Sequence, residues 1–331
     1  MHRITTYALV LFSLACGSDD KTSTDTGTTS ETSNSTTQTT TSDTTNTTSS
    51  PSSVDKGCEV PGPALDQETF SFMVGDMERS YRINAPALAK GTSVPLIIAF
   101  HGADGRNARF PQQNQFNELA TNNEAILVYA MSELVAPNEG EWQLNTTDEM
   151  HHDIDYVEAL IDQVASSYCI DRDRIYATGY SLGSMFTYEL PCHLPETFAA
   201  IASHAGTMPV AMYSCDTSSS MGILHIHGQR DILIDYREAW DWKEWDFVGT
   251  MMGVPALIEF WDNTYACTDD TSSQLGDAEY IVHSGCSGDV RVEHIGVKRL
   301  GHEWPQTIDG SQTSELIWDF LRDFSRANRD D

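Results

Sequence analysis

The sequence predicts an α/β protein whose mostly parallel central sheet carries helices on both faces. Continuous apolar runs at residues 95–100 and 125–130 are typical of strands that are buried on both sides. Apolar residues at helical spacing, as over residues 154–168, alternate with such runs along the chain. Strands that alternate with helices favour parallel pairing, because each crossover helix returns the chain to the same end of the sheet.

The N-terminal elements are predicted to be a hairpin, two buried strands and a helix. Residues 70–74 and 79–83 form the hairpin, and Gly75-Asp76 between them is a turn signal. The apolar strands at 95–100 and 125–130 follow. The helix is indicated by six residues at helical spacing, namely Ile154, Val157, Leu160, Ile161, Val164 and Tyr168.

The C-terminal elements continue the alternation. Residues 174–178 are predicted to form a strand that runs into Gly179, and a helix over 185–190 follows. Later strands are expected at 223–227 and 290–294. A closing amphipathic helix is marked by Leu316, Ile317, Phe320, Leu321 and Phe324.

Composition limits the class of protein. A chain of 331 residues has room for one large domain or two small ones, and its 40% hydrophobic residues are enough for a substantial core. Its 49 acidic residues against 19 basic ones give a formal net charge of -30. Such a chain is repelled by nucleic acids and anionic lipids. We therefore expect a soluble, solvated surface and no nucleic-acid partner.

The N-terminus has the pattern of an export signal. Arg3 precedes a short apolar run at residues 7–15, which is well below the ~20 residues that a membrane-spanning helix needs. The run ends at Ser13-Leu-Ala-Cys16, which is similar to a bacterial lipoprotein cleavage site, with Ser in place of the usual Leu. We expect residues 1–16 to be a lipoprotein-type signal peptide and Cys16 to carry lipid. The alternative is an ordinary signal peptide cut nearby.

Three regions follow from this organisation. Beyond the signal, residues 17–57 are Ser/Thr-rich with almost nothing apolar, so they are expected to form a disordered linker. Residues 58–331 form the catalytic domain. The protein is therefore expected to be exported, and either lipid-anchored at the bacterial cell envelope or secreted. Its contact with the membrane is expected only through the N-terminal lipid.

The cysteines support export. If Cys16 carries lipid, six of the seven cysteines remain, and an even number in an exported protein predicts disulfides. Cys267–Cys286 is the favoured pair, because the loop between them is short and polar. The disulfide candidates are Cys58, Cys169, Cys192, Cys215, Cys267 and Cys286. No C-x-x-C spacing is present, and neighbouring His151-His152-Asp153 side chains seldom converge on one ion, so no metal is expected.

Gly179-Tyr-Ser181-Leu-Gly183 indicates a nucleophilic serine. A predicted strand precedes the motif and a predicted helix follows it, as a nucleophile elbow requires. Side chains beside the serine would clash in so sharp a turn, and glycines relieve this. The turn also places the hydroxyl at a helix N-terminus, where developing negative charge is favoured.

A base and an acid are expected downstream, because a serine hydroxyl is a poor nucleophile by itself. His302, after the last predicted strand, would take the proton of Ser181. Asp231, after the strand at 223–227, would orient and stabilise the imidazole. Asp235 is the alternative acid, and His294 and His283 are the alternative bases.

Two backbone amides complete the predicted machinery. Phe100-His-Gly-Ala103 ends the first buried strand, and the N–H of Ala103 is predicted to form an oxyanion hole with the N–H of Leu182. The alternative interpretation of this segment is a plain glycine turn.

These motifs together resemble the exported esterases that include polyhydroxybutyrate depolymerases, feruloyl esterases and acetylxylan esterases. The resemblance spans most of residues 58–325 and implies the α/β-hydrolase fold, with Ser181, Asp231 and His302 as the triad. Ser184 departs from the family, which usually has Gly there, and this should only crowd the helix start. The segments that carry the resemblance are His101-Gly102, Cys169 through Tyr176, Gly179 through Cys192, Phe198 through Ala202, His227 through Asp231, Phe260 through Cys267 and Gly301 through Pro305.

The resemblance implies hydrolysis of a carboxylic ester, either small or polymeric, through an acyl-enzyme and without a cofactor. Feruloyl or acetyl esters of plant polysaccharide and polyhydroxyalkanoate-type polyesters both fit. Trp304, Trp240 and Tyr180 are expected to contact substrate. Tyr236, Trp240, Trp242 and Trp245 form either an aromatic platform or the packing of an inserted helix.

Two other functions stay open at this point. One is a surface-tethered, non-catalytic binding protein on a hydrolase scaffold, because fold does not imply function. The other is a peptidase of the same fold.

Overall fold

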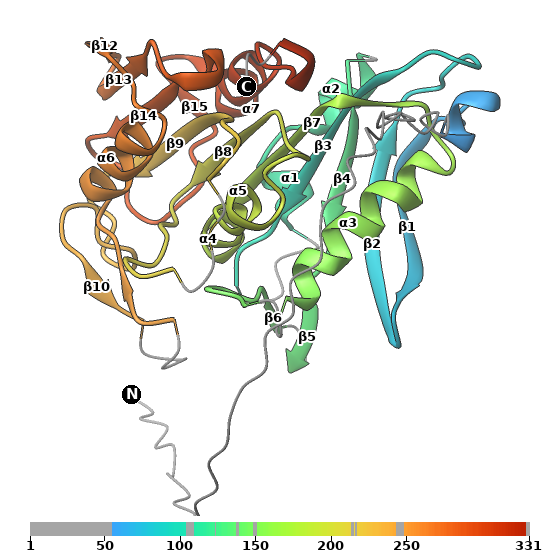
Figure 1. Cartoon of the computed structure of the whole chain (residues 1–331), viewed down its shortest axis with the longest axis horizontal. Coiled ribbons are helices and arrows are strands. Elements are labelled where there is room, and N and C mark those ends of the chain that lie inside the picture. Colours follow the sequence, from blue (N-terminus) through green and yellow to red (C-terminus); the bar gives the residue numbers. More distant parts are fainter. Residues whose placement is uncertain are drawn as a thin grey trace, which may run out of the picture. The chain divides into compact units, whose positions relative to one another are not determined.

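A ten-stranded sheet forms the centre of the computed structural model (Figure 1). Its six inner strands, from β4 to β14, are parallel, and two antiparallel strands extend each side. The predicted mostly parallel sheet is therefore confirmed. In spatial order the strands are β1 (Leu65–Val74), β2 (Met77–Ala85), β4 (Ile126–Ala130), β3 (Val94–Phe100), β7 (Ile170–Tyr180), β8 (Ala200–His204), β9 (Gly222–Gly228), β14 (Val292–Val297), β13 (Ala278–Ser284) and β12 (Asp269–Leu275).

The structure describes residues 55–103, 109–122, 124–136, 139–147, 151–212, 215, 217–242 and 248–328. The predicted signal peptide, Cys16, most of the predicted linker and Trp245 lie outside the described residues. Within the described part, no helix is both long and apolar enough to cross a membrane.

Helices cover both faces of the sheet, as predicted. The Tyr176 side chain of β7 packs edge-on against Trp318 of α7. Gly179, three residues further along β7, faces α4 instead. Residues three apart on a strand point to opposite faces, so α7 and α4 lie on opposite sides of the sheet. The helices are α1 (Phe110–Gln113), α2 (Asn117–Thr121), α3 (His152–Ala165), α4 (Leu182–Thr187), α5 (Glu189–His193), α6 (Val254–Thr264) and α7 (Thr313–Leu321).

The core follows the apolar runs of the sequence. Every residue of β3, β4, β8, β9 and β14 is buried. The outer strand β12 is exposed at six of its seven positions, since it carries polar residues almost throughout. The inner parallel strands therefore hold the core, and their carboxyl ends carry the candidate site.

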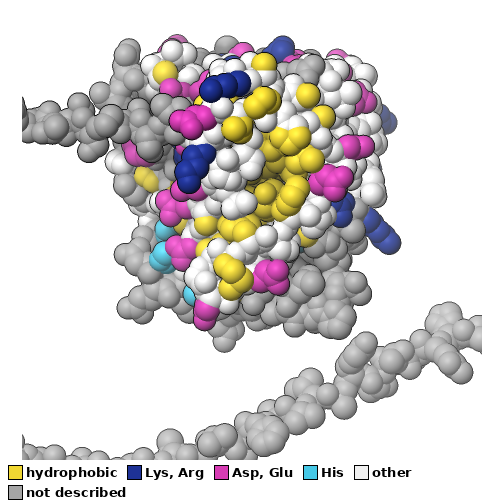
Figure 2. Space-filling view, turned by 90° about the vertical axis from the view of Figure 1, so that its right-hand side faces the viewer, with side chains coloured by type: hydrophobic (Ala, Val, Ile, Leu, Met, Phe, Trp, Pro, Cys, Tyr) yellow, Lys and Arg dark blue, Asp and Glu magenta, His cyan; other side chains and the backbone are white. Residues whose placement is uncertain are grey.

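The other edge of the sheet is more apolar. The predicted hairpin is present as β1 and β2, and its turn contains Gly75 at a φ of 60°, which glycine adopts without strain. Figure 2 shows hydrophobic side chains gathered in a band on the side of the molecule where β1 lies. Val60, Phe70 and Met73 are large apolar side chains with more than a third of their surface exposed.

The helix predicted over 185–190 is two short helices instead. α4 ends at Thr187 and α5 begins at Glu189. Pro191 is the physical reason, because it has no N–H to donate to the Thr187 carbonyl. The break places Tyr188 between the two helices, where it is completely buried.

Three short two-stranded sheets lie outside the central sheet. Their strands are β5 (Glu133–Ala136) with β6 (Glu139–Glu141), β10 (Trp240–Asp241) with β11 (Thr250–Met251), and β15 (Thr307–Ile308) with β16 (Ser311–Gln312). Trp240 therefore lies in a β-ribbon, and the described residues 236–242 contain none of the inserted helix considered for this segment. Short 3-10 helices are η1 (Lys56–Glu59), η3 (Ser287–Asp289) and η4 (Arg326–Asn328).

Three disulfides join the six candidate cysteines. Cys267–Cys286 is the pair that the sequence favoured, and it links the end of α6 to the loop after β13. Disulfides are typical of proteins that fold in an oxidising compartment, which indicates export. The other two pairs are Cys58–Cys169 and Cys192–Cys215.

Candidate active site

Ser181 lies in a sharp turn between β7 and α4. Its φ of 55° and ψ of -120° are unusual for a residue with a side chain, so the backbone is strained there. The turn is held by a hydrogen bond from the Ser181 N–H to the His204 carbonyl oxygen, 2.9 Å away. The strained turn lifts the Ser181 side chain out of the sheet edge.

Neighbouring glycines make this turn sterically possible. A Cβ at Gly179 would lie 2.2 Å from the Gly183 carbonyl oxygen, and one at Gly183 would lie 2.3 Å from the Phe100 carbonyl oxygen. A Cβ at Gly206 would likewise lie 2.4 Å from the Ser181 carbonyl oxygen. The sequence motif did not mark this glycine. The glycines therefore allow three backbone segments to meet around one serine.

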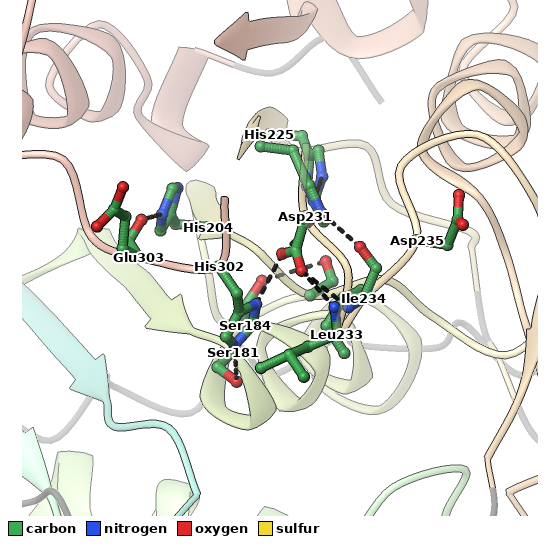
Figure 3. Close-up of polar contacts among 12 residues, drawn as sticks. Ser181, Ser184, His204, His225, Asp231, Leu233, Ile234, Asp235, His302 and Glu303 are labelled. Carbon is green, nitrogen blue, oxygen red and sulfur yellow. Dashed lines mark hydrogen bonds and ion pairs between the residues drawn. The ribbon is translucent and has the colours of Figure 1, made fainter. Parts of the chain in front are cut away.

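The structure brings Ser181, His302 and Asp231 together (Figure 3). The Ser181 Oγ lies 2.8 Å from His302 Nε2. On the other side of the ring, His302 Nδ1 lies 2.7 Å from Asp231 Oδ2. A carboxylate accepts only, so Nδ1 carries the hydrogen and Nε2 is free to accept from the serine hydroxyl. The geometry is that of a nucleophile, a base and an acid that orients the base.

Asp231 is held as an anion at the carboxyl end of β9. Its Oδ1 accepts hydrogen bonds from the N–H groups of Leu233 and Ile234, at 2.9 and 3.0 Å. Burial alone would raise the pKa of Asp231, but hydrogen bonds from His227, His302 and Ile234 hold that pKa well below its usual value. Asp231 therefore stays charged opposite His302.

The alternative acid and bases lie elsewhere. Asp235 uses Oδ1 to accept the N–H groups of Arg237 and Glu238, and Figure 3 shows it well apart from the Ser181–His302 pair. His294 accepts from the Tyr236 hydroxyl. His283 pairs with Asp262 at 3.0 Å. Within the described residues, none of these three side chains is hydrogen-bonded to Ser181 or to Asp231.

Tyr180 and Trp304 were predicted to contact substrate, but the structure places both on the side of His302 away from the cavity. The Tyr180 ring stacks on the His302 imidazole at a centroid distance of 5.5 Å. Trp304 packs edge-on against Tyr180 and against His204. Both side chains are at least 92% buried, and neither lines the cavity in front of Ser181. Tyr180 points away from that cavity because the strand alternation turns it toward the α7 face.

His204 fixes the segment that follows His302. Its Nε2–H donates to the Glu303 carbonyl oxygen at 2.9 Å (Figure 3). Burial lowers the pKa of His204 to about 3, so this ring is neutral. The contact was not predicted from sequence, because it joins residues that are 99 positions apart.

Hydrogen bonds also hold the segment that leads to Ala103, one of the two residues predicted to supply oxyanion amides. Ala103 and Leu182 both line the cavity beside Ser181. The preceding His101 carbonyl oxygen accepts a hydrogen bond from the Trp142 indole at 2.9 Å. Burial lowers the pKa of His101 to about 4, and its neutral ring bonds to Ser132. Trp142 and Ser132 are functional neighbours that no sequence motif marked.

Ser184 does more than crowd the helix start. Its hydroxyl donates to the Gly206 carbonyl oxygen at 3.2 Å and also contacts the Ser203 hydroxyl. Both partners belong to β8 or to the segment after it. The Ser184 hydroxyl therefore ties α4 to β8 and to the segment that follows β8.

The cavity in front of Ser181 has a volume of about 630 Å³. Trp240 and Trp242 form one wall, with ring centroids 5.6 Å apart. The Trp240 indole N–H is buried and has no hydrogen-bond partner among the residues that the structure describes. The mouth carries Ile232 and Leu233, which are 92% and 65% exposed. Of the predicted substrate contacts, only Trp240 lies in the cavity.

His151-His152-Asp153 has a structural role. Asp153 is buried and pairs with Arg79 at 2.6 Å, while His151 pairs with Asp155. The Arg79 guanidinium also lies 4.0 Å from the centre of the Tyr156 ring. Within the described residues, no group of three or more His, Cys, Asp or Glu side chains is arranged to hold a metal.

Comparison with known proteins shows a likeness to esterases. A family model described as phospholipase/carboxylesterase matches residues 93–245. The chain is 24% identical over 250 residues to a bifunctional acetylxylan esterase/xylanase of Neocallimastix patriciarum, a match that covers 73% of this chain and 33% of that protein. It is 23% identical over 236 residues to feruloyl esterase B of Piromyces equi, which covers 70% of this chain and 42% of that protein.

A solved structure shows the fold. The acetyl xylan esterase from Aspergillus awamori matches with a TM-score of 0.57 at 14% identity, over 77% of this chain and 99% of that chain. The predicted α/β-hydrolase fold and the resemblance to its esterases are thereby confirmed. The chain spans less than half the length of the two curated relatives named above.

Proposed function

From the α/β-hydrolase fold and the likeness to esterases, we propose that the chain is a serine esterase that hydrolyses carboxylic esters through Ser181, His302 and Asp231. The observation that carries the proposal is the unbroken run of hydrogen bonds from the Ser181 hydroxyl to Asp231, at 2.8 and 2.7 Å. It starts at a strained turn that opens into a cavity of about 630 Å³.

Hydrolysis proceeds in two steps. His302 Nε2 takes the proton of Ser181 as Oγ attacks the ester carbonyl carbon. The imidazolium then gives this proton to the leaving alcohol, and an acyl-enzyme forms. His302 next deprotonates a water molecule, which attacks the acyl group and releases the carboxylic acid and free Ser181. Asp231, held as an anion, stabilises the imidazolium in both steps.

The oxyanion of each tetrahedral intermediate is stabilised by the backbone N–H groups of Ala103 and Leu182. Both residues line the cavity at Ser181. Removing one such donor in comparable enzymes costs about 3 kcal/mol of transition-state stabilisation. The His101 contacts to Trp142 and Ser132 keep the Ala103 segment in place, so little reorganisation is needed during the reaction.

The wall of the cavity favours an ester that carries a flat ring. Trp240 and Trp242 line the cavity and offer aromatic faces to a bound group. A phenolic or sugar ring can pack on such faces, so we place feruloyl or acetyl esters of plant polysaccharide first. Ile232 and Leu233 at the mouth would suit a polyhydroxyalkanoate chain, which is the second substrate class.

The proposal includes the location of the protein. Residues 1–15 would be removed by cleavage before Cys16, which would carry the lipid as the first residue of the mature protein. Residues 17–57 would tether the catalytic domain, residues 58–331, to the cell envelope. Labelling of growing cells with a radioactive fatty acid tests the anchor: wild-type protein should take up label and the Cys16→Ala variant should not.

The activity is tested with three esters and one variant. Full-length protein is assayed on methyl ferulate, an acetyl ester and a short hydroxybutyrate oligomer, with Ser181→Ala as control. We expect turnover of at least one ester by the wild type and none by the folded Ser181→Ala protein. A fluorophosphonate probe should label Ser181. Absence of both turnover and labelling would favour a binding protein on this scaffold.

A matched pair of variants tests the acid. Asp231→Asn should lower kcat by about 10³- to 10⁴-fold, because the His302 ring loses the partner that sets its tautomer. Asp235→Asn should keep most of the activity, since this side chain caps backbone N–H groups instead. Equal losses in the two variants would contradict the assignment. Rates on an ester and its matched amide separate the esterase from a peptidase.

A further inference from the structure

A chain of buried polar side chains runs up to Asp231 from the side opposite His302. The Tyr188 hydroxyl lies 2.8 Å from His225 Nδ1. His225 Nε2 lies 3.1 Å from His227 Nδ1. His227 Nε2 then lies 3.3 Å from Asp231 Oδ2, the oxygen that also accepts from His302. All three members of this chain are completely buried, so it is part of the core behind the site.

The two acceptors next to His227 Nε2 determine the direction of the hydrogen bonds along this chain of side chains. His227 Nε2 faces Asp231 Oδ2 and the Ile234 carbonyl oxygen, which lies 3.1 Å away. Both are acceptors only, so Nε2 carries a hydrogen. Burial lowers the pKa of His225 well below its usual value, so His225 is neutral. The contacts then run in one direction: the Tyr188 hydroxyl donates to His225 Nδ1, and His225 Nε2 donates to His227 Nδ1.

His227 contacts both ends of the short loop over residues 231–234, which follows β9. Its Nε2–H lies within reach of the Asp231 carboxylate and of the Ile234 carbonyl. The Ile234 N–H in turn donates to Asp231 Oδ1. The His227 imidazole therefore holds both the loop backbone, through the Ile234 carbonyl, and the Asp231 carboxylate. A carboxylate with donors on both oxygens cannot rotate about its terminal bond without losing one of them.

We propose that His227 is a positioning residue for the reaction: it holds the Asp231 carboxylate toward His302 by donating from Nε2, and the Tyr188–His225 pair holds His227 in the ring orientation that this donation requires. The inference deepens the proposed ester hydrolysis and rests on it. His227 touches no reacting atom, so its effect passes through Asp231 to the orientation of His302.

The burial of His225 and His227 indicates that these side chains do more than fill space in the core. An apolar side chain would pack in the same place without needing a partner, whereas a buried imidazole costs free energy unless both nitrogens are hydrogen-bonded. Strand β9 carries two such rings on one face, at His225 and His227, and both are satisfied. The polar chain has a specific end point, the triad carboxylate, which an apolar core would not provide.

Three variants of the full-length protein test the proposal. His227→Leu removes both nitrogens, and His227→Gln keeps one N–H donor near the Nε2 position. His294→Leu is the matched control: His294 is also buried and lies next to His225, but it bonds to the His225 carbonyl and to Tyr236. Thermal unfolding shows that each variant is folded. If His227→Leu does not fold, His227→Asn replaces it, because its shorter amide cannot reach Asp231.

The readout is kcat and KM on the best ester, together with the rate constant for fluorophosphonate labelling of Ser181. We expect His227→Leu to lower kcat and the labelling rate by about 10- to 100-fold with KM nearly unchanged. His227→Gln should recover most of this loss, and His294→Leu should stay within about threefold of wild type. The proposal is overturned if His227→Leu keeps wild-type kcat, if His227→Gln is no better than His227→Leu, or if His294→Leu loses as much.

A spectroscopic readout separates this proposal from the proposed function. The hydrogen on His302 Nδ1, shared with Asp231, gives a far-downfield proton resonance that needs no substrate. Wild type and His294→Leu should show it, and His227→Leu should shift or broaden it. If no ester is hydrolysed but this pattern holds, the proposed function fails and the positioning role stands. An unchanged resonance in His227→Leu contradicts the positioning role, whatever the activity.

Discussion

The Tyr180 hydroxyl donates a hydrogen bond to the His302 carbonyl oxygen, 3.1 Å away, while its ring stacks on the His302 imidazole. The residue directly before the candidate nucleophile therefore positions the candidate base. Both contacts act on a segment that has no regular secondary structure of its own at His302. The middle position of the Gly-x-Ser motif thus has a role that the motif itself does not reveal.

Tyr180→Phe should lower kcat about two- to tenfold and leave KM nearly unchanged. The ring still stacks on His302, but the hydrogen bond to its carbonyl is lost, and such bonds contribute about 0.5–1.5 kcal/mol. Steady-state kinetics on the best ester measures the effect. Tyr180→Ala, which removes the stacked ring as well, should lose more. A larger loss in the Phe variant than in the Ala variant would contradict this account.

Gly183→Ala should destabilise the protein by about 1–3 kcal/mol and lower kcat at least tenfold. The new methyl group would lie 2.3 Å from the Phe100 carbonyl oxygen, so the end of β3 must shift and carry the Ala103 amide with it. Urea unfolding and ester hydrolysis measure the two effects. Gly301→Ala is the control, because the nearest atom to its Cβ is 3.9 Å away. That variant should stay within about 0.5 kcal/mol of wild type.

Loss of the Cys58–Cys169 disulfide should cost more stability than loss of Cys267–Cys286. The first bond closes a separation of 111 residues and the second one of 19. Loop entropy then gives about 4–5 kcal/mol for the first and about 3 kcal/mol for the second. Urea unfolding of the two double Cys→Ser variants checks the order. Equal or reversed losses would show that residual structure in the unfolded chain dominates.

The protein should lose stability as the pH falls from about 6.5 toward 4. Burial lowers the pKa of His204 to about 3 and that of His294 and His101 to about 4. Free histidine titrates near 6.5, so in this window the unfolded chain binds protons that the folded chain does not. Each such group contributes up to about 1.4 kcal/mol per pH unit.

Urea unfolding at pH 7.5, 6 and 5 measures this dependence. His294→Leu should have a shallower pH dependence, because one buried imidazole is gone. Asp231 adds a second loss at lower pH: its pKa is depressed in the folded state, so its contribution disappears as the pH falls below about 4. A free energy of unfolding that is constant or increases on acidification would contradict the prediction.

The sequence was sufficient for the elements whose signal is local. The apolar runs of β3 and β4 and the helical spacing of α3 appear in the structure within a few residues of the predicted bounds. The predicted strand at 290–294 begins two residues later, at Val292. Strand β12 was not predicted, because polar residues at nearly every position leave no alternation to detect. Its backbone pairing with β13 holds it in the sheet.

In the candidate site, too, residues with a local sequence signal were predicted and those placed by tertiary packing were not. Ser181, Asp231 and His302 were candidates because each follows a predicted strand in the expected order. The positions of Tyr180 and Trp304 depended on which face of the sheet they occupy, and the motif does not encode that. The Tyr188–His225 contact joins residues 37 positions apart across a helix junction created by Pro191. Such contacts follow from tertiary packing, which one sequence read locally does not provide.

The three residues of the candidate triad come from segments that are far apart in the chain. The Ser181–His302 contact spans 121 positions and the Asp231–His302 contact spans 71. Ser181 follows β7 and Asp231 follows β9, whereas His302 follows β14, the last parallel strand in the chain. A nascent chain that has not yet reached His302 can therefore form the elbow but has no base to activate it.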